Sequence, residues 1–215
     1  MKKLPYWIRV SVAVCCCFLA LGCGRRLKKA VQHYQTGRDY FDRGELQKAV
    51  DELELAIHQE PDLAPAHHAL GLTYIYLNKP AVAVSYLQRA LEIDSRDVAA
   101  RLDLAELYRK QGLHQQAVQE NLRILFYNSG VPQAARNLGV IYANNLYHFR
   151  YARYYLTRYL ELEPDAPDKA QIEQWIAVIE QRLVDQREEQ QKREELRPPD
   201  APPMRLSAAP KVSPQ

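Results

Sequence analysis

Aromatic and small residues recur along the chain at a constant interval of 34 residues. Each tyrosine of one series has a small residue three positions before it. The pairs are Gly37 and Tyr40, Gly71 and Tyr74, Ala105 and Tyr108, and Gly139 and Tyr142. A fixed period of this length predicts a stack of similar units, because no single unit can bury its apolar face alone. The abundance of Ala, Leu, Gln, Glu and Arg beside only eight Gly favours helix over strand.

A second set of positions follows the same interval and extends the pattern. It consists of Ala49, Ala83 and Ala117, then Leu53 and Leu87, then Ala56 and Ala90. Together the two sets resemble the tetratricopeptide repeat family over residues 30–164, with repeats at 30–63, 64–97, 98–131 and 132–166. The third repeat departs from the family at Asn121 and Ile124, and the second helix of the fourth fits after a one-residue insertion. The resemblance implies an all-α fold, an α-solenoid of about four helix pairs.

The spacing within each unit has a physical reason. Small residues let the two antiparallel helices approach closely, and tyrosine and leucine fill the remaining space. Gly44, Asn78 and Gly112 fall between the two helices of a unit, where we expect a left-handed backbone conformation. Pro61 and Pro164 are expected to end the second helices of their units.

The last unit of such a stack exposes an apolar face, and residues 167–196 supply a helix to cover it. Apolar residues of this segment form one helical stripe: Ile172, Trp175, Ile176, Ile179 and Leu183. Asp168 is the expected N-cap. The charged residues 185–195 either continue the helix into solvent or fray. Residues 197–215 hold six of the 13 prolines and are expected to form a disordered tail.

The first 22 residues have the features of a bacterial signal peptide. Basic residues precede the apolar run 10–21, which is shorter than the roughly 20 residues needed to span a bilayer. Residues 19–23, Leu-Ala-Leu-Gly-Cys, resemble the lipobox of bacterial lipoproteins, which implies cleavage before Cys23 and acylation of its thiol. Residues 23–29 are then the acylated cysteine and a short linker. The alternatives are an uncleaved N-terminal anchor and ordinary signal cleavage.

The residue after Cys23 bears on the membrane that would hold the chain. In lipoproteins an Asp at that position commonly retains the protein in the inner membrane. Gly24 stands there, so the resemblance implies a lipid-anchored protein of the bacterial cell envelope, in the outer membrane and facing the periplasm. Cys15, Cys16 and Cys17 leave with the signal peptide. Neither a disulfide nor a cysteine-based zinc site is therefore expected in the folded part.

Charge and motifs point away from nucleic-acid binding and from catalysis. The formal net charge is +3, but residues 1–22 hold three basic residues and no acidic one, which leaves 26 of each. A nucleic-acid-binding domain normally keeps a basic surplus. No Gly-rich phosphate loop, HExxH or GxSxG occurs. His33 and His67 occupy one packing position in successive repeats, and His67 and His68 diverge on a helix. We expect no metal, no cofactor other than the lipid on Cys23, and no enzymatic activity.

The family resemblance also implies a binding surface. In tetratricopeptide repeats the first helices line a concave groove that takes a helix or an extended peptide of a partner protein. Carried over position by position, the groove residues are Tyr34, Arg38, Phe41, His68, Leu72, Tyr76, Glu106, Arg109, Arg136 and Asn144. The early members are apolar or aromatic, and the later ones are mostly charged. Tyr and Arg are common anchors of protein interfaces.

Three functions are compatible with this organisation. The first is a membrane-anchored scaffold for envelope assembly, because the layout resembles that of pilotins, which guide an outer-membrane secretin for type IV pili or secretion. The second is an adaptor for enzymes of peptidoglycan synthesis or hydrolysis. The third is binding of cell-wall carbohydrate, for which the 14 tyrosines would provide stacking surfaces.

Overall fold

The computed structural model describes residues 25–196, which are helical apart from short turns. A first helix covers residues 25–42 of this part. It is followed by α2 (Leu46–Gln59), α3 (Ala64–Tyr76), α4 (Pro80–Ile93), α5 (Val98–Lys110), α6 (His114–Tyr127), α7 (Pro132–Asn144), α8 (Phe149–Leu162) and α9 (Lys169–Glu195). No strand occurs between residues 25 and 196, and the predicted all-α fold is confirmed. The predicted signal peptide, Cys23 and the Pro-rich tail lie outside the described residues.

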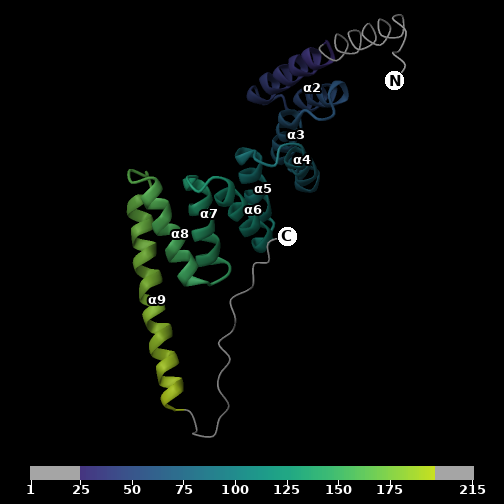
Figure 1. The fold of residues 1–215 in the computed structure, drawn as a ribbon. Coiled ribbons are helices and arrows are strands. Elements are labelled where there is room, and N and C mark those ends of the chain that lie inside the picture. Colours follow the sequence, from purple (N-terminus) through teal and green to yellow (C-terminus); the bar gives the residue numbers. More distant parts are fainter. Residues whose placement is uncertain (1–24, 197–215) are drawn as a thin grey trace, which may run out of the picture.

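Consecutive helices pack as antiparallel pairs, and the pairs stack into the predicted solenoid (Figure 1). α3 pairs with α4, α5 with α6, and α7 with α8, while α3 and α7 also contact α5. The apolar core therefore runs along the stack as a series of clusters between the helices. Because the first helices of successive pairs touch one another, they form one continuous face.

The turn inside each pair places one residue in the left-handed conformation. The prediction for Gly44, Asn78 and Gly112 is confirmed by φ values of 78°, 56° and 76°. In the fourth pair the left-handed residue is Tyr147, with φ 53°. α8 begins 35 residues after α6, whereas α2, α4 and α6 begin at intervals of 34. The one-residue insertion inferred from the sequence therefore lies in the turn between α7 and α8, which holds a bulky residue in a rarely populated conformation.

Three pairs bring a glycine of the first helix against a leucine of the second. A Cβ added to the glycine would lie within 2.7 Å of the leucine side chain at Gly37 and Leu53, Gly71 and Leu87, and Gly139 and Leu156. The third pair has Ala105 at the glycine position and Asn121 at the leucine position. The added methyl group of Ala105 is thus accompanied by a smaller side chain opposite, which accounts for the departure from the family pattern at residue 121.

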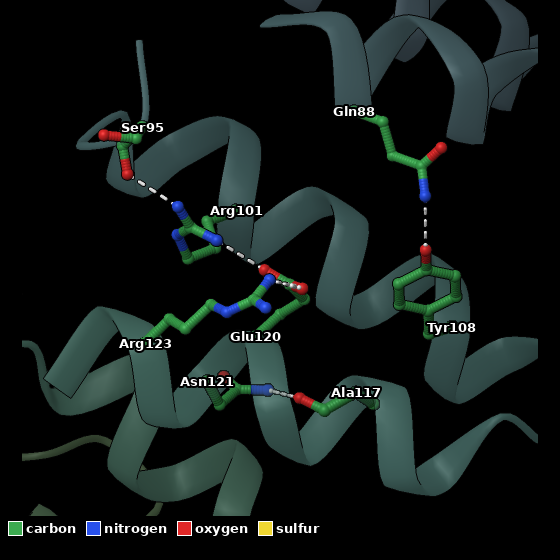
Figure 2. Close-up of polar contacts among 8 residues, drawn as sticks. All are labelled: Gln88, Ser95, Arg101, Tyr108, Ala117, Glu120, Asn121 and Arg123. Carbon is green, nitrogen blue, oxygen red and sulfur yellow. Dashed lines mark hydrogen bonds and ion pairs between the residues drawn. The ribbon is translucent and has the colours of Figure 1, made fainter. Parts of the chain in front are cut away.

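Burial of Asn121 is compatible with a stable core because its amide is hydrogen-bonded. Nδ2 donates to the carbonyl oxygen of Ala117 at 2.7 Å, within the same helix (Figure 2). Oδ1 accepts from Nδ2 of Asn137 on α7 at 3.3 Å. The side chain therefore satisfies its own polar atoms and links the third pair to the fourth.

The C-terminal helix covers the last pair through the predicted stripe. Ile172 and Ile179 are buried, and Trp175, Ile176 and Leu183 pack against the same cluster. Residues 185–195 continue the helix with exposed side chains. No helix within residues 25–196 is long and apolar enough to cross a membrane.

The N-cap position predicted for Asp168 is confirmed, but the capping hydrogen bond expected of its side chain is wrong. Asp168 precedes α9 as its N-cap, but its side chain makes no capping hydrogen bond. The carboxylate instead accepts from Nε of Arg136 and from the hydroxyl of Tyr159, both at 2.7 Å. Two charged or polar groups of the preceding pair thus outcompete the backbone N–H groups of α9 for this carboxylate.

Candidate functional site

The first helix and α3 enclose a cleft of about 250 Å³ on the face formed by the first helices of the pairs. Its walls combine apolar and polar side chains from the two helices: Tyr34, Arg38, Phe41, Asp42, Pro65, His68, Ala69 and Leu72. Five of these, Tyr34, Arg38, Phe41, His68 and Leu72, are residues that the family resemblance assigns to the groove. We refer to this cleft as the N-terminal cleft.

Aromatic rings and one guanidinium group define the mouth of the N-terminal cleft. The Tyr76 ring meets the Phe41 ring edge-on at 5.2 Å, and Tyr76 is 67% exposed. The Arg38 guanidinium lies 5.9 Å from the Tyr34 ring centroid. Arg38 is exposed and makes no ion pair with any other residue between 25 and 196. The cleft therefore offers an apolar floor and one cation whose donors are open to a ligand.

His68 forms the wall between the cleft and α5. Its Nε2 lies 2.7 Å from Oδ2 of Asp103, and its Nδ1 lies 3.7 Å from Oδ2 of Asp97. Asp97 also caps α5 by accepting from the N–H of Ala100 at 3.0 Å. These contacts hold the imidazole in place, so His68 shapes the cleft with its ring while its nitrogens face α5.

The charged residues predicted further along the groove are satisfied within the chain. Glu106 accepts from Nε and Nη2 of Arg109, both at 2.7 Å, and lies 3.7 Å from Nζ of Lys110. The Arg109 guanidinium keeps the pKa of the Glu106 carboxyl below its ordinary value, and Glu106 raises the pKa of Arg109. This pairing leaves less charge available to a partner than the sequence suggested.

Arg136 is also engaged, through the ion pair with Asp168 that ties α7 to the start of α9. Hydrogen bonds from the Tyr159 hydroxyl and from Arg136 lower the pKa of Asp168. Burial, together with the hydrogen bond to Asp168, raises the pKa of Tyr159 to about 12. Arg136 therefore stabilises the junction between the last pair and its capping helix.

Asn144 lies apart from the other groove residues, in a second cleft where α9 meets the end of α7. This cleft is lined by Ala143, Asn144, Tyr147, Phe149, Trp175, Val178, Ile179 and Arg182. The predicted groove residues thus fall into three settings: the open N-terminal cleft, a middle section of internal ion pairs, and the cleft against α9. Their role in binding stays a prediction.

The third repeat contains a buried ion pair, between Arg101 and Glu120, that was not predicted from the sequence. Nη1 of Arg101 lies 2.5 Å from Oε2 of Glu120, and Nη2 donates to the carbonyl oxygen of Ser95 at 2.6 Å (Figure 2). Arg123 also donates to Glu120, at 2.7 Å. The side chains of Arg101 and Glu120 are only 7% and 9% exposed. Arg101 is thus a structural residue that fixes α5 against α6 and the preceding turn.

His33 and His67 occupy the position of Arg101 in the first two repeats, and both make structural contacts. Nδ1 of His33 lies 2.7 Å from Oε2 of Glu52, and Nε2 of His67 lies 2.8 Å from the carbonyl oxygen of Pro61. Since Nε2 of His67 faces a carbonyl, it carries the proton that donates. Within residues 25–196 no three His, Cys, Asp or Glu side chains are grouped to hold a metal ion.

Comparisons with known proteins agree on the fold. Residues 68–135 match a family model described as tetratricopeptide repeat, and residues 37–78 match one described as TPR repeat. YrrB, described as a TPR protein with an unusual peptide-binding site, is 24% identical with a TM-score of 0.59, covering 67% of this chain and 74% of that chain. The structure of pilF from Pseudomonas aeruginosa is 24% identical with a TM-score of 0.62, covering 76% and 71%. The first TPR of Spaghetti (RPAP3), bound to an HSP90 peptide, is 20% identical with a TM-score of 0.52, covering 54% and 93%.

Proposed function

Because the chain belongs to the tetratricopeptide repeat family, we propose that it is a membrane-anchored scaffold that binds a segment of a partner protein in the N-terminal cleft. One observation carries this proposal. Five residues that the family pattern assigns to the ligand groove line one cleft, and Arg38 at its mouth makes no ion pair or hydrogen bond within residues 25–196 beyond its contact with the Tyr34 ring. Tetratricopeptide repeats with this fold include proteins described as binding peptides.

The chemistry of the cleft favours a particular kind of segment. Phe41 and Leu72 provide an apolar floor that suits an aliphatic or aromatic side chain, and Tyr76 extends it. The free guanidinium of Arg38 suits a carboxylate or a backbone carbonyl of the same segment. We therefore propose an extended peptide or helix with an apolar anchor next to an acidic residue.

The membrane anchor and the cellular role are part of the same proposal. The lipobox-like sequence that ends at Cys23 supports acylation of that thiol, which would hold the scaffold at the outer membrane facing the periplasm. The combination of a lipidated cysteine with repeats, and the similarity in fold to pilF, favour a role in envelope assembly such as type IV pilus or secretin biogenesis. An adaptor for peptidoglycan enzymes is the rival within the same class.

Crosslinked capture from envelope fractions tests the proposal. The native protein is compared with Cys23→Ala, which cannot be acylated, and with Leu72→Glu, which places a charge on the cleft floor. Leu55→Glu is the matched control, because Leu55 is exposed on α2 outside the cleft. We expect a specific partner to be lost with Leu72→Glu and kept with Leu55→Glu.

The identity of the captured protein separates the roles. A secretin captured only by the acylated form supports lipid-dependent assembly. Peptidoglycan enzymes captured by the native and Cys23→Ala forms alike support the adaptor role, with the lipid as a tether. Capture that is insensitive to Leu72→Glu, or no specific partner at all, contradicts the scaffold proposal.

Exposed aromatic side chains support one candidate of another class. Phe126 on α6 is 83% exposed, and Tyr154 on α8 is 62% exposed. Tyr154 also lines a cleft with Arg153 and Arg158. Exposed rings can stack on sugar faces, so these side chains would suit a cell-wall glycan. Co-sedimentation with isolated cell wall that is lost in a Phe126→Ala, Tyr154→Ala variant would favour this function over protein scaffolding.

A further inference from the structure

The start of the described chain carries a dense basic cluster. Arg25, Arg26, Lys28 and Lys29 occupy four of five successive positions, and all four are exposed. The next acidic residue along the chain is Asp39. None of the four side chains makes a hydrogen bond or an ion pair with another residue of the part that the structure describes. These charges therefore stabilise no contact of the fold and are open to an external anion.

Removing this cluster from the charge count reverses the balance of the chain. Residues 30–215 hold 22 basic and 26 acidic residues, so the rest of the chain is net negative while the cluster carries four positive charges. Figure 1 shows the helix that carries the cluster at one end of the solenoid and α9 at the other. The cluster is therefore a concentrated positive patch at one end of a chain whose remainder is net negative.

We infer that the basic cluster binds the anionic headgroups of phospholipids and sets the orientation of the solenoid on the membrane. The inference rests on the proposed acyl anchor, because Cys23 lies two residues before Arg25 and would hold the cluster at the headgroup level. Lys and Arg next to an anionic leaflet are attracted to it within a Debye length. A polybasic segment beside acyl chains supplies a second, separable membrane signal.

The one apolar residue between the charges, Leu27, fits the same surface. Leu27 is 46% exposed, and it lines an open hollow with Lys28 and Val31. A leucine flanked by basic residues can enter the boundary between headgroups and acyl chains while the charges stay at the phosphates. The net negative remainder is repelled by the same leaflet. The solenoid would then stand away from the membrane with its cleft accessible to a partner.

Vesicle binding by an unacylated protein tests the cluster by itself. Because residues 25–196 form one packed stack, the chain from residue 23 to residue 215 is used, with Cys23→Ser to prevent acylation. Vesicles rich in phosphatidylglycerol are compared with neutral phosphatidylcholine vesicles at low and high salt. The test variant is Arg25→Gln, Arg26→Gln, Lys28→Gln, Lys29→Gln. The matched control removes four exposed basic residues near the other end: Lys169→Gln, Arg187→Gln, Lys192→Gln, Arg193→Gln.

We expect binding to the anionic vesicles alone, reduced by salt, and weakened by at least about a hundredfold in the test variant, since each basic residue contributes roughly fivefold at low salt. The control variant should bind like the parent protein. Equal binding to neutral vesicles, no binding, an equal loss in the control, or tighter binding to an oligonucleotide than to anionic vesicles would each overturn the inference. Acylation of Cys23, measured by mass spectrometry, and capture of the partner are independent readouts. A result against lipid binding by the basic cluster is therefore distinguishable from a result against the proposed function.

Discussion

Two sections of the face formed by the first helices, the N-terminal cleft and the middle section, differ in how their polar groups are used. In the N-terminal cleft the Arg38 guanidinium is open, and the aromatic rings of Phe41 and Tyr76 face solvent at the mouth. In the middle section Arg109 is bound by two oxygens of Glu106, and Arg136 is bound by Asp168. A charged residue in a groove thus predicts binding only where the fold leaves that charge without a partner.

The largest stability effect should come from the buried ion pair of the third repeat. Glu120→Leu leaves the Arg101 guanidinium buried with only the Ser95 carbonyl, which should lower the free energy of unfolding by about 3–5 kcal/mol. The double variant Arg101→Met, Glu120→Leu should recover most of this loss, because no buried charge remains. Chemical denaturation of the three proteins measures both effects.

The first repeat provides the matched control for that experiment. His33 and Glu52 occupy the same positions, but their side chains are 33% and 27% exposed. Glu52→Leu should therefore cost less than about 1 kcal/mol. Equal losses for Glu52→Leu and Glu120→Leu would contradict the claim that burial distinguishes the two repeats.

A core substitution tests the compensation between Ala105 and Asn121. Asn121→Leu restores the family residue but places a larger side chain against the Ala105 methyl, and should destabilise the protein by about 1–3 kcal/mol through overpacking. Adding Ala105→Gly should relieve the clash and reduce the loss. Thermal unfolding of the native protein, the single variant and the double variant measures both effects. If the double variant is less stable than Asn121→Leu alone, the two residues are not matched in size.

Repetition explains why so much of the fold could be predicted from the sequence. The helix pairs, the left-handed turns at Gly44, Asn78 and Gly112 and the stripe on α9 depend on local spacing and on apolar periodicity, which the sequence displays directly. The insertion before α8 also follows from register. The sequence also displays the basic residues Arg25, Arg26, Lys28 and Lys29. It does not show that the fold leaves their side chains without ion-pair or hydrogen-bond partners within residues 25–196.

The pairing of charges could be predicted only in part. Arg101 and Glu120 lie 68 residues after His33 and Glu52, two repeat lengths along, so the register contained a signal for that pair. Arg136 and Asp168 gave no such signal, because their contact depends on where α9 begins relative to α7. The ordinary expectation of a capping aspartate was wrong because a nearby guanidinium and a phenol compete for the same oxygens.

Affinity for the partner should separate Arg38 from Arg109. Arg38→Ala should weaken binding of the captured partner segment by about tenfold, the value of one charge-assisted hydrogen bond, with unfolding unchanged. Arg109→Ala should change affinity by less than about twofold, since Glu106 already occupies that guanidinium. Titration calorimetry with the two variants measures the difference, and Arg96→Ala, at an exposed turn outside the cleft, controls for loss of charge. A larger effect for Arg109→Ala would move the binding site to the middle of the groove.

The smallest effect should appear at the junction of the last pair with α9. The Tyr159 hydroxyl and Arg136 lower the pKa of Asp168 in the folded protein, so this carboxylate stabilises the fold at pH values above the ordinary range for Asp, near 4. As the pH falls through the lowered pKa, both states are protonated and the contribution disappears. Asp168→Asn should therefore lower the free energy of unfolding by about 1 kcal/mol or less at neutral pH, where the pair is partly exposed, and by nothing in strong acid. The unfolding free energies of the native and Asp168→Asn proteins should converge as the pH is lowered. At neutral pH the two proteins should bind the partner with the same affinity. A difference between the two proteins that is independent of pH would mean that α9 is held by its apolar stripe alone, and that Arg136 is free to serve the groove.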